Sequence, residues 1–218
     1  MTQAVSSPPK TSGAGLEGVV AAPSEICFID GNAGRLVYRG YEIADLVENA
    51  SFEEVAFLLW DEKLPNRAAL AQLNKDLGAS TALPAHALSI LRALPKQTVP
   101  MDALRTAVSS LSSADPDLHS NDQEANRRKA VRLTAQFPTI VAAFHKLRAG
   151  QEPIAPDPTL TVAGNFLYML SGKKAHDTIT RVLDAALVLH AEHGFKSHDV
   201  RPGALNAGRF GAAVEIEQ

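Results

Sequence analysis

The stretch DAALVLHAEHGFKSHD, residues 184–199, begins as an apolar helical run and then loses its pattern within a few residues. It places His190 and His193 three positions apart, a spacing that puts two side chains on one face of a helix. Three apolar residues share that side of the expected helix, namely Leu183, Ala186 and Leu187. We therefore expect a core helix that ends in a His-x-x-His pair, followed by a segment of different character.

The histidine pair has both a structural and a functional interpretation. An imidazole at the end of a helix can donate a hydrogen bond to a substrate oxygen, and it can equally satisfy a neighbouring carbonyl. A zinc site is a third interpretation, because the stretch holds residue types that zinc accepts. The candidate ligands are His190, His193, His198 and either Glu192 or Asp199. Their spacing differs from the His-Glu-x-x-His pattern of helical zinc proteases, so we expect no metal here.

Helical periodicity dominates the chain between about residue 41 and this stretch. Ser51 and Glu54 predict a capping box at the start of the helix SFEEVAFLLW. Gly78 is expected to end the helix that begins near residue 67, and Pro138 is expected to kink or divide a long helix. The other expected helices cover residues 41–50, 85–94, 101–113, 123–150, 161–172 and 175–193.

The β signals are confined to the N-terminal part of the chain. Three short runs are rich in β-formers, at residues 19–20, 26–29 and 36–38. The turn-forming residues 30–34 separate the last two runs and predict a small hairpin. Cys27 lies in one of the strands and is expected to be a small core residue. Taken together, the elements predict a mainly α protein with a small β hairpin near its start.

Composition and charge describe an ordinary globular protein. The 218 residues carry a net charge of −3, which gives no electrostatic case for nucleic-acid binding. The cationic run Arg127, Arg128, Lys129 and Arg132 is expected to be a solvated helix face. Asp102 and Arg105 are expected to form a local ion pair. One cysteine fits a reducing compartment, and no apolar run approaches the roughly 20 residues of a membrane span. We therefore expect a cytoplasmic protein without membrane or nucleic-acid partners.

The expected organisation has three parts. Residues 1–15 are rich in Ser, Pro and Gly and are expected to form a disordered arm. Residues 16–195 contain the hairpin and the helices. Residues 196–218 hold turn-forming residues without an amphipathic pattern and form a separate tail.

Six segments of the chain, taken in order, resemble bacterial citrate synthases. They are LEGVVAAPSEICFIDGNAGRLVYRGYEIADL, SFEEVAFLLW, PMDALRTAVSSL, EANRRKAVRLTAQFPTIVAA, NFLYML and LVLHAEHGF. The resemblance covers roughly residues 16–195, and it is specific because separate segments match in order. It implies the N-terminal portion of the large domain of a multi-helical fold, incomplete at the C-terminus.

The resemblance also implies an activity. Citrate synthases are acyltransferases that condense acetyl-CoA with oxaloacetate and water to give citrate and CoA, at the entry to the tricarboxylic acid cycle. Acetyl-CoA is a substrate, and no cofactor is implied. The family forms homodimers, so an apolar surface is expected on the helices between Met101 and His193. A 2-methylcitrate synthase that uses propanoyl-CoA is one alternative, and a non-catalytic dimerisation or interaction module is another.

Few functional residues can be transferred from the family. His193 matches the second histidine of the family's His-x-x-His motif, which contacts oxaloacetate. His190 matches the first, whose role looks more structural, and it is a second candidate for the same contact. Lys196-Ser197-His198-Asp199 stands where the family continues with Asn-Ala-Ser-Thr.

No residue matches the catalytic base, the enol-stabilising histidine or the CoA site, so no catalytic residue is assigned. The resemblance therefore predicts that this chain is inactive on its own. A change of reading frame and a truncation would each explain the tail.

Overall fold

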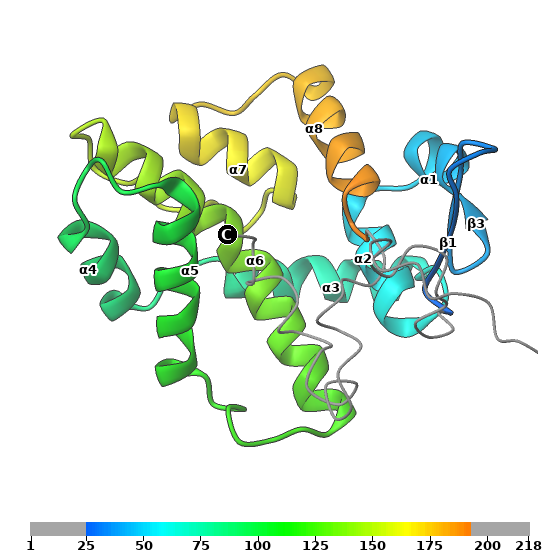
Figure 1. Cartoon of the computed structure of the whole chain (residues 1–218), viewed down its shortest axis with the longest axis horizontal. Coiled ribbons are helices and arrows are strands. Elements are labelled where there is room, and N and C mark those ends of the chain that lie inside the picture. The colour runs from blue at the N-terminus through cyan, green and yellow to red at the C-terminus, as the bar shows by residue number, and fades with distance from the viewer. Residues whose placement is uncertain (1–24, 193–218) are drawn as a thin grey trace, which may run out of the picture.

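A computed structural model describes residues 25–192 of the chain, and helices make up most of them (Figure 1). The helices are α1 (Ile43–Asn49), α2 (Phe52–Asp61), α3 (Arg67–Ser80), α4 (Ala85–Ala93), α5 (Pro100–Leu111), α6 (Gln123–Arg148), α7 (Val162–Ser171) and α8 (Asp177–Leu189), with a 3-10 turn η1 (Ser112–Ala114) after α5. The predicted mainly α class is confirmed. Across residues 25–192 we find no helix with the length and apolarity of a transmembrane span.

The predicted hairpin is present and carries one more strand. Strands β1 (Cys27–Asp30), β2 (Arg35–Tyr38) and β3 (Tyr41–Glu42) form an antiparallel sheet in the order β1-β2-β3. The Asp30 carboxylate accepts from the backbone N–H groups of Asn32 and Ala33, which closes the turn between β1 and β2. The expected β run at residues 19–20 lies outside the described residues.

Of two helix boundaries predicted from neighbouring residues, one is present in the structure and one is not. The capping box at the start of α2 is present, with the Ser51 hydroxyl and the Glu54 carboxylate each accepting from the other residue's backbone N–H. The predicted end of α3 at Gly78 is wrong, because the helix continues to Ser80. A Cβ atom at Gly78 would lie 2.2 Å from the carbonyl oxygen of Pro158. Gly78 therefore permits a close approach between α3 and the segment before α7.

The longest helix, α6, is not divided at Pro138. It begins at the Asp122 cap, whose side chain accepts from the backbone N–H of Ala125. Buried residues lie on both sides of the proline, including Ala130, Ala135 and Ile140. Packing against neighbouring helices therefore outweighs the hydrogen bond that the proline cannot donate.

The prediction of a solvated cationic face on α6 is wrong for two of its residues. Arg127 stacks on the ring of Trp60 at 4.3 Å from the centroid and pairs with Asp61 at 2.9 Å. Arg132 pairs with Asp115 and Asp117 at 2.6 and 2.8 Å. The two arginines therefore tie the start of α6 to α2 and to the loop after α5. The predicted local pair between Asp102 and Arg105 is confirmed, at 3.7 Å.

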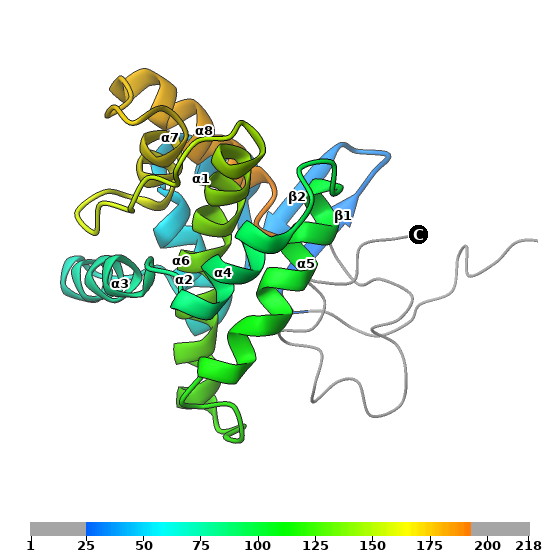
Figure 2. The same cartoon turned by 90° about the vertical axis from the view of Figure 1, so that its left-hand side faces the viewer.

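Three apolar clusters hold the helices together. The first joins α4, α5 and α6 around Leu91, Val108 and Ile140. The second joins the sheet to α1, α2 and α8 around Tyr38, Leu58 and Val188, with Cys27 packed at its edge. The third joins α3 to α6. Figure 1 shows α6 running through the middle of the molecule, with α4 and α5 on one side and the sheet, α1 and α8 on the other, and Figure 2 looks onto the side of α4 and α5.

Candidate functional site

The helix that leads to the histidine pair ends earlier than its sequence suggests. Helix α8 ends at Leu189, and His190 is its C-cap residue with φ −107° and ψ 7°. The expectation of a helix through residue 193 is therefore wrong, and the helical spacing does not define a shared face for the pair. His190 is exposed rather than packed in the core. His193 lies outside the described residues.

The ring of His190 is held by its own helix. Its Nδ1 atom lies 2.7 Å from the carbonyl oxygen of Ala186. Because a carbonyl can only accept, Nδ1 must carry the hydrogen of this bond. The neutral ring then presents a lone pair at Nε2, and only the imidazolium form can donate from that atom. The structural interpretation, in which the imidazole satisfies a carbonyl, is thus confirmed for one nitrogen and leaves the other available.

Polar side chains fix α8 to the ends of two other helices. The Asp184 carboxylate accepts from the backbone N–H of Phe52, at the start of α2, with N–O distances of 3.1 and 3.3 Å. Burial raises the pKa of this carboxyl, and the hydrogen bond from Phe52 opposes that rise. Arg181 donates to the carbonyl oxygens of Val47 and Glu48, at the end of α1, at 3.1 and 2.5 Å. These bonds set the rotation of α8 about its axis.

The turn after α8 is fixed by a tyrosine from the sheet. The Tyr38 hydroxyl lies 2.9 Å from the carbonyl oxygen of Glu192 and 3.2 Å from that of Leu189. Tyr38 is 0 % exposed and belongs to the same apolar cluster as Val188. The position of His190 is therefore linked to the core through the carbonyl directly before it, that of Leu189, and the carbonyl two residues after it, that of Glu192.

The face of α8 that carries His190 is apolar and exposed. Ile179 is 54 % exposed, Val182 is 64 % exposed and Leu189 is 46 % exposed. Ala186 continues this stripe by helical spacing, and the exposed C-cap residue His190 follows at its end. The three residues predicted on the packed side, Leu183, Ala186 and Leu187, are half-buried, whereas the buried residues of α8 are Asp184 and Val188. The expected exposed apolar surface is confirmed on this helix.

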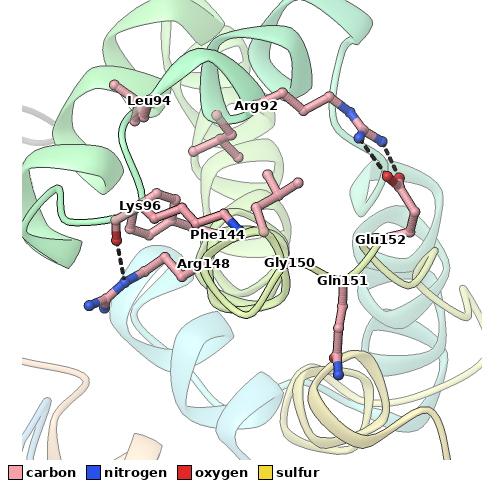
Figure 3. A pocket seen from close by; sticks show the side chains of 10 residues that line it. Arg92, Leu94, Lys96, Phe144, Arg148, Gly150, Gln151 and Glu152 are labelled. Atoms are coloured by element: carbon pink, nitrogen blue, oxygen red, sulfur yellow. Dashed lines mark hydrogen bonds and ion pairs between the residues drawn. The ribbon is translucent and has the colours of Figure 1, made fainter.

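A shallow pocket of about 260 Å³ lies away from α8, between the ends of α4 and α6 (Figure 3). Arg92 pairs with Glu152 at 2.5 Å, and Arg148 donates to the carbonyl oxygen of Lys96 at 3.1 Å. Lys96 lies over Gly150, next to the C-terminal end of α6, where cations are favoured by the helix dipole. These local contacts account for the cationic lining, so the pocket is not the candidate site.

Comparison with known proteins identifies the family. A family model described as "Citrate synthase, C-terminal domain" matches residues 15–197. The chain belongs to the citrate synthase family. A citrate synthase of Haloferax volcanii is 43 % identical over 204 residues, which cover 92 % of this chain and 51 % of the relative. A 2-methylcitrate synthase of Mycobacterium tuberculosis is 42 % identical over 200 residues, covering 92 % of this chain and 48 % of the relative.

Solved citrate synthases share the fold described above. The crystal structure of citrate synthase from Thermotoga maritima superposes with a TM-score of 0.74 and 36 % sequence identity, covering 84 % of this chain and 48 % of that one. The chain thus spans about half the length of the curated relatives that it matches. The family resemblance inferred from the sequence is confirmed.

Of the candidate zinc ligands, the structure describes only His190 and Glu192. Within residues 25–192, no group of three or more His, Cys, Asp or Glu side chains is placed to hold a metal ion. Three of the candidate ligands, His193, His198 and Asp199, lie outside that range.

The sequence did not point to the residues that hold the histidine turn. Tyr38 appears in the sequence as one β-former among several, and Arg181 and Asp184 appear as the polar side of an amphipathic helix. A usable signal existed for Tyr38, because a tyrosine on the buried face of a strand must bring its hydroxyl to a polar partner. Which partner it reaches could not be known, since Glu192 is 154 positions away in the chain.

Proposed function

We propose that this chain is the oxaloacetate-contacting part of a citrate synthase that condenses acetyl-CoA with oxaloacetate and water to give citrate and CoA. His193 makes the contact with oxaloacetate, and His190 stands beside it as a second candidate. The observation that carries the proposal is the exposed imidazole of His190 at the fixed end of α8, in a motif that matches the family. A cytoplasmic location belongs to the same proposal.

The geometry of His190 restricts what it does for a dicarboxylate. Its Nδ1–H is committed to the carbonyl of Ala186. The neutral ring therefore repels a carboxylate oxygen at Nε2, whereas the imidazolium donates a charge-assisted hydrogen bond to it. A hydrogen bond from Nε2 to a carboxylate of oxaloacetate therefore requires the imidazolium form.

A titration of the full 218-residue chain with oxaloacetate tests the proposal. Long-range ¹H–¹⁵N NMR spectra of the imidazoles should show the signals of His190 and His193 moving with oxaloacetate. His86, whose Nε2 lies 2.9 Å from the carbonyl of Ser110, is the internal control and should stay in place. Succinate, which lacks the keto group, is the matched ligand. Signals that ignore oxaloacetate, or that respond equally to succinate, would overturn the proposal.

A 2-methylcitrate synthase is the second candidate activity. It is supported by the similarity to the mycobacterial enzyme of that name, which nearly equals the similarity to the citrate synthase of Haloferax volcanii. Both reactions use oxaloacetate, so the histidine contact is common to them. Because the 218-residue chain is expected to be inactive on its own, a thiol-release assay that compares propanoyl-CoA with acetyl-CoA separates the two only in a full-length protein that contains this segment.

The exposed stripe on α8 supports a homodimer as part of the proposal. Apolar side chains aligned on one helix face are typical of a surface that another chain covers. We expect sedimentation velocity to show self-association that Val182→Glu weakens. Leu118→Glu, at a residue 45 % exposed outside α8, should leave the association unchanged. A chain that stays monomeric at every concentration would favour another role for the stripe.

A further inference from the structure

We propose that Tyr38 is a positioning residue for the histidine turn, and that its hydroxyl sets where His190 stands relative to oxaloacetate. The inference rests on the proposed function for its ligand. Its structural basis is the pair of hydrogen bonds to the carbonyl of Leu189, directly before His190, and to that of Glu192, two residues after it.

The carbonyl groups at the end of α8 show why this hydroxyl matters. A helix leaves its last four carbonyls without intrahelical partners. The carbonyls of Ala186 and Leu187 accept from the His190 N–H, and that of Val188 accepts from the Ala191 N–H. The carbonyl of Leu189 accepts from Tyr38. The tyrosine therefore supplies the donor for the last helical carbonyl.

Helix α8 does not end with a left-handed residue at its C-cap. Many helices end with a glycine in the left-handed region, whose backbone closes the last carbonyls. Here the residue after Leu189 is His190, with a φ of −107°, which is not left-handed. Instead, the Tyr38 hydroxyl from strand β2 donates to the carbonyl of Leu189. The histidine can thus occupy the C-cap position because Tyr38 fixes the turn.

The tyrosine itself has little freedom. Its ring is fully buried among Leu46, Val55, Leu58 and Val188. Burial is the largest cause of a raised pKa for the phenol, so the hydroxyl keeps its proton and remains a donor at neutral pH. A single hydroxyl hydrogen serves two acceptors, and the shorter distance favours Glu192, the residue directly before His193.

The experiment compares Tyr38→Phe with the wild-type chain. The substitution keeps the buried ring and removes only the hydroxyl, so the apolar cluster is preserved. Tyr41→Phe is the matched control, since Tyr41 lies opposite Tyr38 in the sheet and is 41 % exposed. In the ligand-free chain, Tyr38→Phe should shift the imidazole signal of His190 and leave that of His86 unchanged. Tyr41→Phe should leave both signals unchanged.

The same samples are then titrated with oxaloacetate. Loss of one positioning hydrogen bond should weaken binding to Tyr38→Phe by roughly three- to tenfold. An unchanged signal at His190 in the ligand-free variant would overturn the inference. Signals that shift at His86 as well would also overturn it, because they would indicate a general loss of packing. If oxaloacetate fails to bind the wild-type chain, the proposed function fails, while the ligand-free spectra still decide the role of Tyr38.

Discussion

Substitution of Asp184 by alanine should loosen the helix that carries the histidine turn. Asp184 is 7 % exposed, and its carboxylate is the acceptor for the backbone N–H of Phe52. That N–H belongs to the first turn of α2, where the helix supplies no internal acceptor. Alanine would leave it buried without a partner and would remove one of the bonds that join α8 to α2.

The size of the effect follows from two opposing contributions. A hydrogen bond to a charged acceptor stabilises a protein by about 1.5–3 kcal/mol. Burial raises the pKa of the Asp184 carboxyl, which means that holding the charge costs part of this gain. We therefore expect Asp184→Ala to lower the free energy of unfolding by about 1–2 kcal/mol. For a chain of this size the melting temperature should fall by roughly 2–8 °C.

Urea unfolding followed by circular dichroism measures this change. Asp76→Ala is the matched control, because Asp76 is an exposed helical carboxylate that bonds the side chain of Gln72. Its effect should stay within about 0.5 kcal/mol. Asp184→Asn keeps an acceptor oxygen and should lose less stability than Asp184→Ala. Equal stability of Asp184→Ala and the wild-type chain would refute the role of the carboxylate as an anchor of α8.

The remaining predictions concern a close backbone approach, a buried carboxyl and catalysis. Gly78→Ala should lower the free energy of unfolding by about 1–3 kcal/mol, because its Cβ would meet a backbone carbonyl. Gly31→Ala, where a Cβ meets nothing within 4 Å, should be nearly neutral in the same urea titration, and equal effects would contradict the argument. Burial raises the pKa of Glu53, so the folded chain binds that proton more tightly than the unfolded chain does. The stability of the wild-type chain relative to Glu53→Gln should therefore fall as the pH rises from about 4 to about 7, and a rise in urea titrations at the two pH values would show the sign to be wrong. Finally, the 218-residue chain should release no thiol above background from acetyl-CoA and oxaloacetate, because its residues match only the oxaloacetate contact. Turnover that disappears in His193→Ala would contradict this.

The elements that the sequence predicted well are those set by neighbouring residues. The capping box at Ser51 and Glu54 and the hairpin turn at Asp30 form from groups within a few positions of one another. The errors arise where contacts with a segment far away in the sequence determine the local structure. Gly78 looks like a helix terminator until the carbonyl of Pro158 is placed against it. Arg127 looks solvated until Trp60 lies beneath it.

The sequence predicted the histidine motif of the candidate site, but not the exposure or the backbone position of His190. The His-x-x-His pair and its family were accessible from sequence, because the match depends on residue order. The exposure of His190 was not, since it depends on where α8 ends and on how the helix is rotated. Both depend on bonds that span more than a hundred positions, from Tyr38 and Phe52.

The rotation of α8 explains why hydrophobic periodicity failed at the site. The helix has apolar residues around much of its circumference, so periodicity alone cannot select the buried side. Two of its three charged residues, Arg181 and Asp184, reach the ends of α1 and α2. Those helix ends carry unpaired backbone groups, which attract a carboxylate at the start of one helix and a guanidinium at the end of the other. The polar side of α8 thus faces the protein, and the apolar stripe with His190 faces outward. The proposed contact of His190 with oxaloacetate requires an outward-facing imidazole, and bonds to two helix termini give α8 that orientation.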